Sequence, residues 1–157
     1  MSYKHYWGRP LELPRDRFRL FAAECRELRQ ALGVPFLGLF GGVGIGGALG
    51  TGDPTFTQDA VCFNGRPGYE TFLIHPLFHH PAHERGDYDL YWDFVATAQR
   101  PYDTLVVAAL LSFKYHFPEA ALNSDGGEQD WARGINLYQR ATRRKAPSFR
   151  ELAAPQA

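Results

Sequence analysis

The run LVVAALL at residues 105–111 constrains the fold more than any other stretch of this chain. It contains no polar side chain, so a helix through it is apolar on every side and has to be covered on every side. The sequence RPYD precedes the run at residues 100–103, and Pro118 follows it. This pattern predicts a helix that begins near Asp103 and ends before Pro118. The rest of the chain is then expected to cover a central buried helix.

Length and composition are those of one globular domain. A chain of 157 residues with 45% hydrophobic residues can bury roughly two-thirds of its unfolded surface. Lysine plus arginine equals aspartate plus glutamate at 17 each, so no overall field favours nucleic acid or a membrane as a partner. The N-terminal sequence MSYKHYWGRP lacks the apolar core of a signal peptide. We expect a soluble, cytoplasmic protein in which Cys25 and Cys62 remain free thiols.

Hydrophobic periodicity predicts the elements that precede the apolar run. An aromatic segment at residues 3–7 is typical of a strand, and an amphipathic helix follows from Pro14 to a stop at Gly33. Further strands are predicted at 35–40, near 48–51, at 59–63 and 70–74 as a hairpin, and at 88–98 with one face on the core.

The C-terminal third predicts a short edge strand at 120–123 and a last helix. Asp125 and Glu128 have the spacing of a capping box at the start of that helix. The fold class is therefore α+β, a single domain over residues 1–145 with a mainly antiparallel sheet and three helices, the apolar one packed on the sheet. Residues 146–157 are expected to be a flexible tail.

The glycine-rich stretch includes Gly42, Gly44 and Gly47 in the spacing G-x-G-x-x-G. That motif binds a dinucleotide when its third glycine opens a helix. The sequence ALGTGDP that follows Gly47 does not predict a helix, so we interpret the stretch as a flexible extension between strands. An anion held by backbone amides alone stays an alternative.

Histidines are concentrated in the segment after the predicted hairpin. The candidates for metal ligands are His79, His83 and Glu84. Prolines 76 and 81 interrupt the segment and exclude the regular helix that an i, i+4 histidine pair uses. We therefore expect a solvated loop, with no metal and no cofactor.

Polar residues at the ends of predicted elements form the candidate ligand-binding set, because such positions collect functional groups. The set consists of Asn64, Glu70, Arg100, Tyr102, Asp103, Ser124 and Asp125. The sequences RPYD at 100–103 and SDG at 124–126 both precede helix starts. If these starts lie side by side, their amides can hold an anionic or polar ligand.

Two hypotheses from different classes follow. The first is a non-enzymatic module that binds a protein partner, through exposed aromatics such as Tyr3 and Tyr91, or a small polar or anionic ligand. The second is a small hydrolase or nuclease that uses Asp103, Asp125 and Arg100 within about 8 Å of one another, with or without a divalent metal. No serine lies in G-x-S-x-G, so no nucleophile motif favours the second hypothesis.

Six short motifs together resemble a known group of sequences. They are HYW at 5–7, FNG at 63–65, ETF at 70–72, RPYD at 100–103, SDG at 124–126 and DW at 130–131. The pattern resembles a family of small uncharacterised proteins from bacterial and phage genomes, over most of the chain to about residue 140. The family has no assigned activity, so no residue role follows from the resemblance. It implies a third hypothesis, a phage-type protein that sequesters a nucleotide signal.

Overall fold

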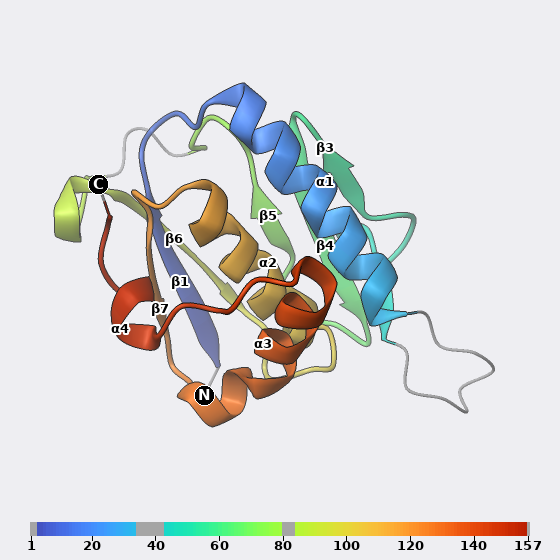
Figure 1. The fold of residues 1–157 in the computed structure, drawn as a ribbon. Helices are drawn as coiled ribbons and strands as arrows, with labels where there is room; N and C mark the ends of the chain where they lie inside the picture. Colours follow the sequence, from blue (N-terminus) through green and yellow to red (C-terminus); the bar gives the residue numbers. More distant parts are fainter. Residues whose placement is uncertain (1–2, 34–42, 80–83, 157) are drawn as a thin grey trace.

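The strands of the computed structural model, which describes residues 3–33, 43–79 and 84–156, form two antiparallel sheets. In the first sheet, β1 (Lys4–Arg9) lies between β6 (Tyr91–Ala96) and β7 (Ala121–Ser124), as Figure 1 shows. In this sheet Tyr6 is opposite both Phe94 and Asn123. The expected short edge strand is therefore present as β7.

The second sheet is organised around β4 (Ala60–Arg66). It pairs with β2 (Gly44–Gly46), β3 (Thr55–Thr57) and β5 (Phe72–Ile74). The pairing of β4 with β5 confirms the predicted antiparallel hairpin. The domain is thus α+β, as the sequence predicted, but with two sheets in place of one.

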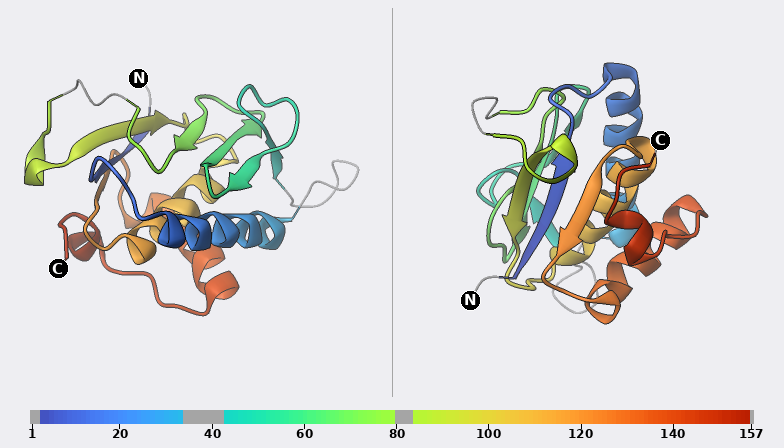
Figure 2. Two further views of the ribbon diagram at one scale, coloured as in Figure 1. Left: turned by 90° about the horizontal axis from the view of Figure 1, so that it is seen from above. Right: turned by 90° about the vertical axis from the view of Figure 1, so that its left-hand side faces the viewer.

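The helices form a second layer on one side of the sheets, which Figure 2 shows from two directions. They are α1 (Arg15–Leu32), α2 (Asp103–His116), α3 (Glu128–Thr142) and the single-turn α4 (Phe149–Leu152). Among the described residues, no helix combines the length and apolar character required to cross a membrane.

The apolar helix α2 is central to this layer, as predicted. Every residue from Leu105 to Lys114 is buried. Helices α1 and α3 pack against it, and α1 contributes a stripe of buried side chains from Phe18 to Leu28. At Gly134 of α3, an added Cβ would lie 2.3 Å from a methyl carbon of Val107, so glycine permits the close approach of the two helices.

The strands predicted at 35–40, near 48–51 and at 88–98 have different outcomes. The segment 35–40 lies outside the described residues. The segment near 48–51 is a turn because the amide of Gly47 donates to the carbonyl of Thr51 at 3.0 Å and closes the chain on itself. The predicted strand 88–98 is shorter, since Asp87–Asp89 is a 3-10 turn and Ala98 has a φ of 52°, which ends the extended backbone after β6. One face of β6 does contact the core, through Val95.

The predicted capping box at α3 is wrong in its residues. The helix begins at Glu128, and the amide of Gly127 donates to Oδ2 of Asp130 at 2.9 Å. Asp125 instead accepts the backbone amide of Lys4 at 3.0 Å. The carboxylate of Asp125, which the sequence spacing assigned to the helix, is therefore bound to the backbone of β1 instead.

The C-terminal segment, for which the sequence predicted a flexible tail, forms a short helix and contacts the rest of the domain. Ser148 caps α4 by accepting the amide of Glu151 at 3.2 Å, and Leu152 is only 3% exposed. Beyond α4, the carbonyl of Ala154 accepts from Nζ of the buried Lys114 at 2.7 Å. These tertiary contacts hold a segment whose own helix is too short to be stable alone.

A carboxylate on α1 joins this helix to two other parts of the fold. Glu24 accepts from the hydroxyl of Ser112 at 2.7 Å, pairs with Arg144, and lies 3.4 Å from Nε2 of His116. Burial alone would raise the pKa of Glu24, but the contacts with His116, Arg144 and Ser112 outweigh it and lower the pKa to about 2. The charged form of Glu24 thus stabilises the folded state.

We predict that Glu24→Gln lowers the free energy of unfolding by about 2 kcal/mol or more at pH 7, because it leaves Arg144 without its charged partner. The contribution of Glu24 is fully present above its ordinary pKa of 4.5 and is lost as the pH falls toward about 2. Urea unfolding should therefore show that wild type and variant converge on acidification. Glu27→Gln, at an exposed position on the same helix, is the control, and an equal loss in both variants at pH 7 would contradict the prediction.

Candidate functional site

A buried histidine connects the first sheet to the start of α2. His5 of β1 is fully buried, and its Nε2 lies 2.6 Å from Oδ1 of Asp103. Its Nδ1 lies 2.8 Å from Oγ of Ser124, the last residue of β7. The hydroxyl of Thr97 donates to the same oxygen of Asp103 at 2.6 Å. We call this set, His5, Thr97, Asp103 and Ser124, the His5 network.

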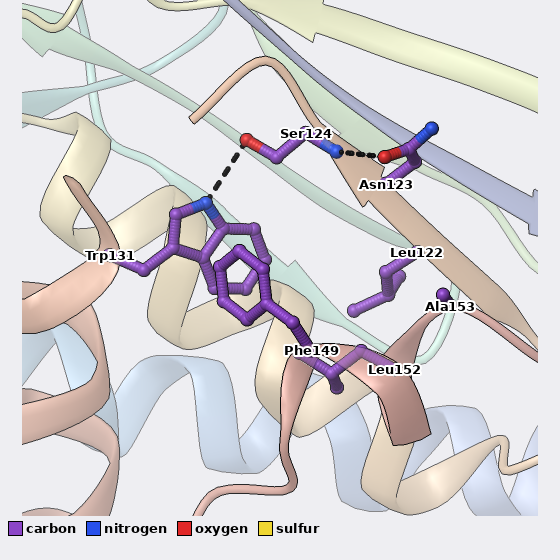
Figure 3. Close-up of a pocket in the computed structure, with 7 residues that line it drawn as sticks. All are labelled: Leu122, Asn123, Ser124, Trp131, Phe149, Leu152 and Ala153. Atoms are coloured by element: carbon purple, nitrogen blue, oxygen red, sulfur yellow. Dashed lines mark hydrogen bonds between the residues drawn. The ribbon is translucent and has the colours of Figure 1, made fainter. Parts of the chain in front are cut away.

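The hydrogen bonds of Ser124 determine where the protons of the His5 network lie. The hydroxyl oxygen of Ser124 accepts from the amide of Gly126 at 3.0 Å and from the indole Nε1 of Trp131 at 3.1 Å, and Figure 3 shows the contact with Trp131. A serine oxygen has two acceptor positions and one proton, so that proton points to Nδ1 of His5. The imidazole proton is therefore on Nε2 and is donated to Asp103.

Aromatic rings enclose the network. The ring of His5 is in edge-to-face contact with Tyr3 and Trp131, at centroid distances of 5.1 and 5.4 Å. The hydroxyl of Tyr3 is buried and has no hydrogen-bond partner among the described residues. Burial and the negative charge of Asp103 raise the pKa of Tyr3 to about 12. Tyr3 is thus half-buried with its hydroxyl in the interior, whereas the sequence suggested an exposed interface residue.

One open pocket joins the starts of α2 and α3, and its volume is about 210 Å³. Asp103 contributes both to this pocket and to the His5 network. The side chains of Arg100 and Arg133 are exposed at the pocket, and their guanidinium groups form no ion pair or hydrogen bond within residues 3–33, 43–79 and 84–156. The lining consists of Gln99, Arg100, Pro101, Asp103, Thr104, Gln129, Asp130, Arg133 and Gly134. We call it the α2–α3 pocket.

A second, smaller pocket adjoins the other end of the network. Its volume is about 60 Å³, and Figure 3 shows the side chains around it. The rings of Trp131 and Phe149 meet edge to face at 5.0 Å, and Leu122 and Leu152 are also in the wall with Ser124. The volume is far below the roughly 300 Å³ at which ligand pockets begin. Ser124 therefore has no substrate-sized space on this side.

Two members of the predicted ligand-binding set, Glu70 and Tyr102, join the two sheets instead, and a third, Asn64, is used within the β4–β5 hairpin. The amide of Ala96 donates to Oε1 of Glu70 at 2.7 Å, and the hydroxyl of Tyr102 donates to the carbonyl of Glu70 at 2.6 Å. Asn64, which is 6% exposed, donates to the carbonyl of Tyr69 at 3.1 Å and accepts its amide at 3.2 Å. These hydrogen bonds within the chain involve the polar groups that the sequence predicted to bind a ligand.

The remaining members separate into two places. Arg100 and Asp103 share the α2–α3 pocket, whereas Asp125 is not part of its lining. The carboxylate of Asp125 accepts the amide of Lys4 at 3.0 Å and the hydroxyl of Tyr6 at 3.4 Å. The grouping of Asp103, Asp125 and Arg100 that the hydrolase hypothesis uses is therefore divided between separate sets of partners.

The glycine-rich stretch is not followed by a helix. Gly42 lies outside the described residues, Gly44 is in β2, and the amide of Gly47 is used inside the turn that follows. Arg66 donates to the carbonyls of Gly50 and Gly52, each at 2.5 Å. The end of the stretch is thus tied to β4, where the sequence predicted a flexible extension.

The histidine-rich segment is only partly described. His83 lies outside the described residues, whereas His79 contacts His75 edge to face at 3.9 Å, and Glu84 is exposed. Within the described part of the chain, no three histidine, cysteine, aspartate or glutamate side chains form a group that could hold a metal ion. Burial raises the pKa of Cys25 and of Cys62, which makes both thiols poor nucleophiles.

Three residues of this region, His5, Trp131 and Arg133, were not among the site residues expected from the sequence. A histidine between aromatic residues in a predicted strand indicates a buried imidazole that needs partners. The partners themselves lie 98 and 119 positions away along the chain, so only the fold identifies them.

Comparisons with protein-family models, with curated proteins and with solved structures found no match to this chain. The resemblance to bacterial and phage-encoded proteins therefore stays a prediction.

We predict that His5 and His75 carry their ring protons on different nitrogens. For His5 the proton is expected on Nε2, because Nδ1 accepts from the hydroxyl of Ser124. For His75, Nδ1 lies 3.1 Å from the carbonyl oxygen of Asp59, and a carbonyl can only accept, so the proton is expected on Nδ1. A two-bond ¹H–¹⁵N correlation spectrum at pH 8 distinguishes the two forms. A proton on Nδ1 of His5 would show that Ser124 donates elsewhere.

Proposed function

We propose that this chain is a non-enzymatic module that binds a small anionic ligand in the α2–α3 pocket. The observation that carries the proposal is the presence of two unpaired guanidinium groups, Arg100 and Arg133, in one pocket. Guanidinium groups bind carboxylates and phosphates through paired hydrogen bonds. The starts of α2 and α3 add the positive ends of two helix dipoles.

The two carboxylates in the pocket are better compensated than the two arginines. Oδ1 of Asp103 already accepts from His5 and Thr97. Asp130 accepts the amide of Gly127 at 2.9 Å and the side chain of Gln99 at 3.4 Å. The hydrogen-bonding capacity that is left in the pocket therefore comes mainly from the donors, Arg100 and Arg133, and favours an anion.

The volume of the pocket limits the ligand. About 210 Å³ is less than a drug-sized molecule occupies, so the pocket fits a phosphate or carboxylate group with few attached atoms. A nucleotide would place its phosphate there and its base outside. Sequestration of a nucleotide signal, the hypothesis from the family resemblance, is one specific form of this proposal.

Binding can be tested with inorganic phosphate and adenosine monophosphate by isothermal calorimetry. We expect at least one of them to bind wild type, and Arg100→Gln and Arg133→Gln each to weaken its affinity about tenfold, because each removes a charge-assisted hydrogen bond. Arg19→Gln, at an exposed position of α1 outside the pocket, is the matched control. An equal loss in the control, or no binding of either anion, would refute the proposal.

A hydrolase is the second candidate, because Ser124, His5 and Asp103 form a continuous hydrogen-bonded series with distances of 2.8 and 2.6 Å. Such a series activates a serine when its oxygen is free to attack. Here that oxygen accepts from both Gly126 and Trp131, so attack requires the loss of one donor. We favour a structural role for the series on this ground.

A fluorophosphonate probe separates the two candidates. We predict that wild type forms no covalent adduct in intact-mass spectrometry, because both acceptor positions of Ser124 are occupied. An adduct on wild type that is absent from Ser124→Ala would favour the hydrolase. Far-ultraviolet circular dichroism of the variant shows whether its fold is retained.

A further inference from the structure

Aromatic side chains gather on the outer face of the first sheet. Trp7 and Val95 face the core, so the alternation of a strand places Tyr6, Trp92 and Phe94 on the opposite face. Figure 2 shows that the helices lie on the core side and leave the other side of this sheet without a helical layer. Phe94 is 49% exposed.

Part of this face is a pocket of about 450 Å³, which we call the aromatic pocket. It is lined by Tyr6, Gly86, Asp87, Trp92 and Asn123. None of these residues contributes to the α2–α3 pocket. The pocket is shallow and open to solvent, so a small ligand in it keeps part of its surface in water.

The indole of Trp92 is held in place at this pocket. Its Nε1 donates to the carbonyl of Asp87 at 3.1 Å. An added Cβ on Gly8, the residue opposite Trp92 in β1, would lie 2.6 Å from indole carbon Cε2. The ring therefore lies directly against the backbone of β1, which fixes one wall of the pocket.

The charges around the aromatic pocket are mainly negative. The carboxylate of Asp87 is exposed and forms no hydrogen bond or ion pair in the part of the chain that is described. The carboxylate of Asp125 lies 3.4 Å from the hydroxyl of Tyr6. On the same face, Nζ of Lys4 lies 4.9 Å from the ring centre of Phe94. An ammonium group of the chain itself thus makes a cation–π contact with one of these aromatic rings.

We propose that the aromatic pocket binds an organic cation, an ammonium group with alkyl substituents, between Tyr6 and Trp92 with Asp87 as the counter-charge. The rings attract a cation through their π faces and cover its alkyl groups. Asp87 selects for positive charge. A single nucleic-acid strand also stacks on aromatic rings, but it needs a positively charged groove, which Asp87 and Asp125 oppose.

Choline is the probe, and 3,3-dimethyl-1-butanol, in which carbon replaces the charged nitrogen, is its neutral control. Trp7 and Trp131 are 1% and 2% exposed, so Trp92 is the tryptophan that responds most to a ligand at the surface. We expect choline to change the fluorescence saturably and the neutral compound to bind at least fivefold more weakly. Equal binding of the two compounds, or no saturable response to choline, would overturn the proposal.

Variants locate the binding. Asp87→Asn is expected to weaken choline binding at least fivefold, because it removes the counter-charge and keeps the side-chain shape. Asp89→Asn is the matched control, since Asp89 lies in the same turn but pairs with Arg85 at 3.1 Å and is outside the pocket. An equal effect of the two substitutions would mean that general charge attraction, and not the aromatic pocket, accounts for the binding.

Discussion

The burial of α2 on every side is the constraint on which the rest of the structure depends. Its residues from Leu105 to Lys114 are all buried, and no single neighbouring element can cover a helix of this kind. The sheets cover one side, and α1 and α3 cover the others. Near the two ends of the helix, the side chains of Asp103 and Lys114 are only 13% and 3% exposed, so the fold has to supply partners for these polar groups.

Two polar clusters meet that requirement, one at each end of α2. At the start, Asp103 is satisfied by His5 and Thr97, and the same histidine continues to Ser124 of the edge strand. At the other end, Nζ of Lys114 donates to the carbonyls of Pro118, Ala120 and Ala154, at 2.9, 2.6 and 2.7 Å. A donor or acceptor left alone at either place would cost about 1 to 3 kcal/mol. The clusters thereby attach the edge strand and the C-terminal segment to the central helix.

Polar groups with a structural role differ from those available to a ligand in whether they have hydrogen-bond partners within the chain. Ser124, Asn64 and Glu70 have polar character and suggestive positions, yet their hydrogen-bonding groups are used by other parts of the chain. The side chains that stay unpaired among the described residues include Arg100, Arg133 and Asp87, and each of them lines a pocket. The proposed binding sites rest on these remaining charges.

By itself, the sequence determined the helices and the hairpin that can be recognised from the spacing of apolar residues and from turn residues. The stripe of α1, the apolar run of α2 and the β4–β5 hairpin follow from periodicity and turn residues, and the structure confirms them. The α2 and α3 helix starts line one pocket, which contains Arg100 and Asp103 of RPYD and also Arg133, whereas Asp125 of SDG is outside its lining. Only the tertiary structure decided which polar groups pair, because His5 reaches partners 98 and 119 residues away. Such pairing depends on how the layers pack, so it cannot be predicted from patterns within a short stretch of sequence.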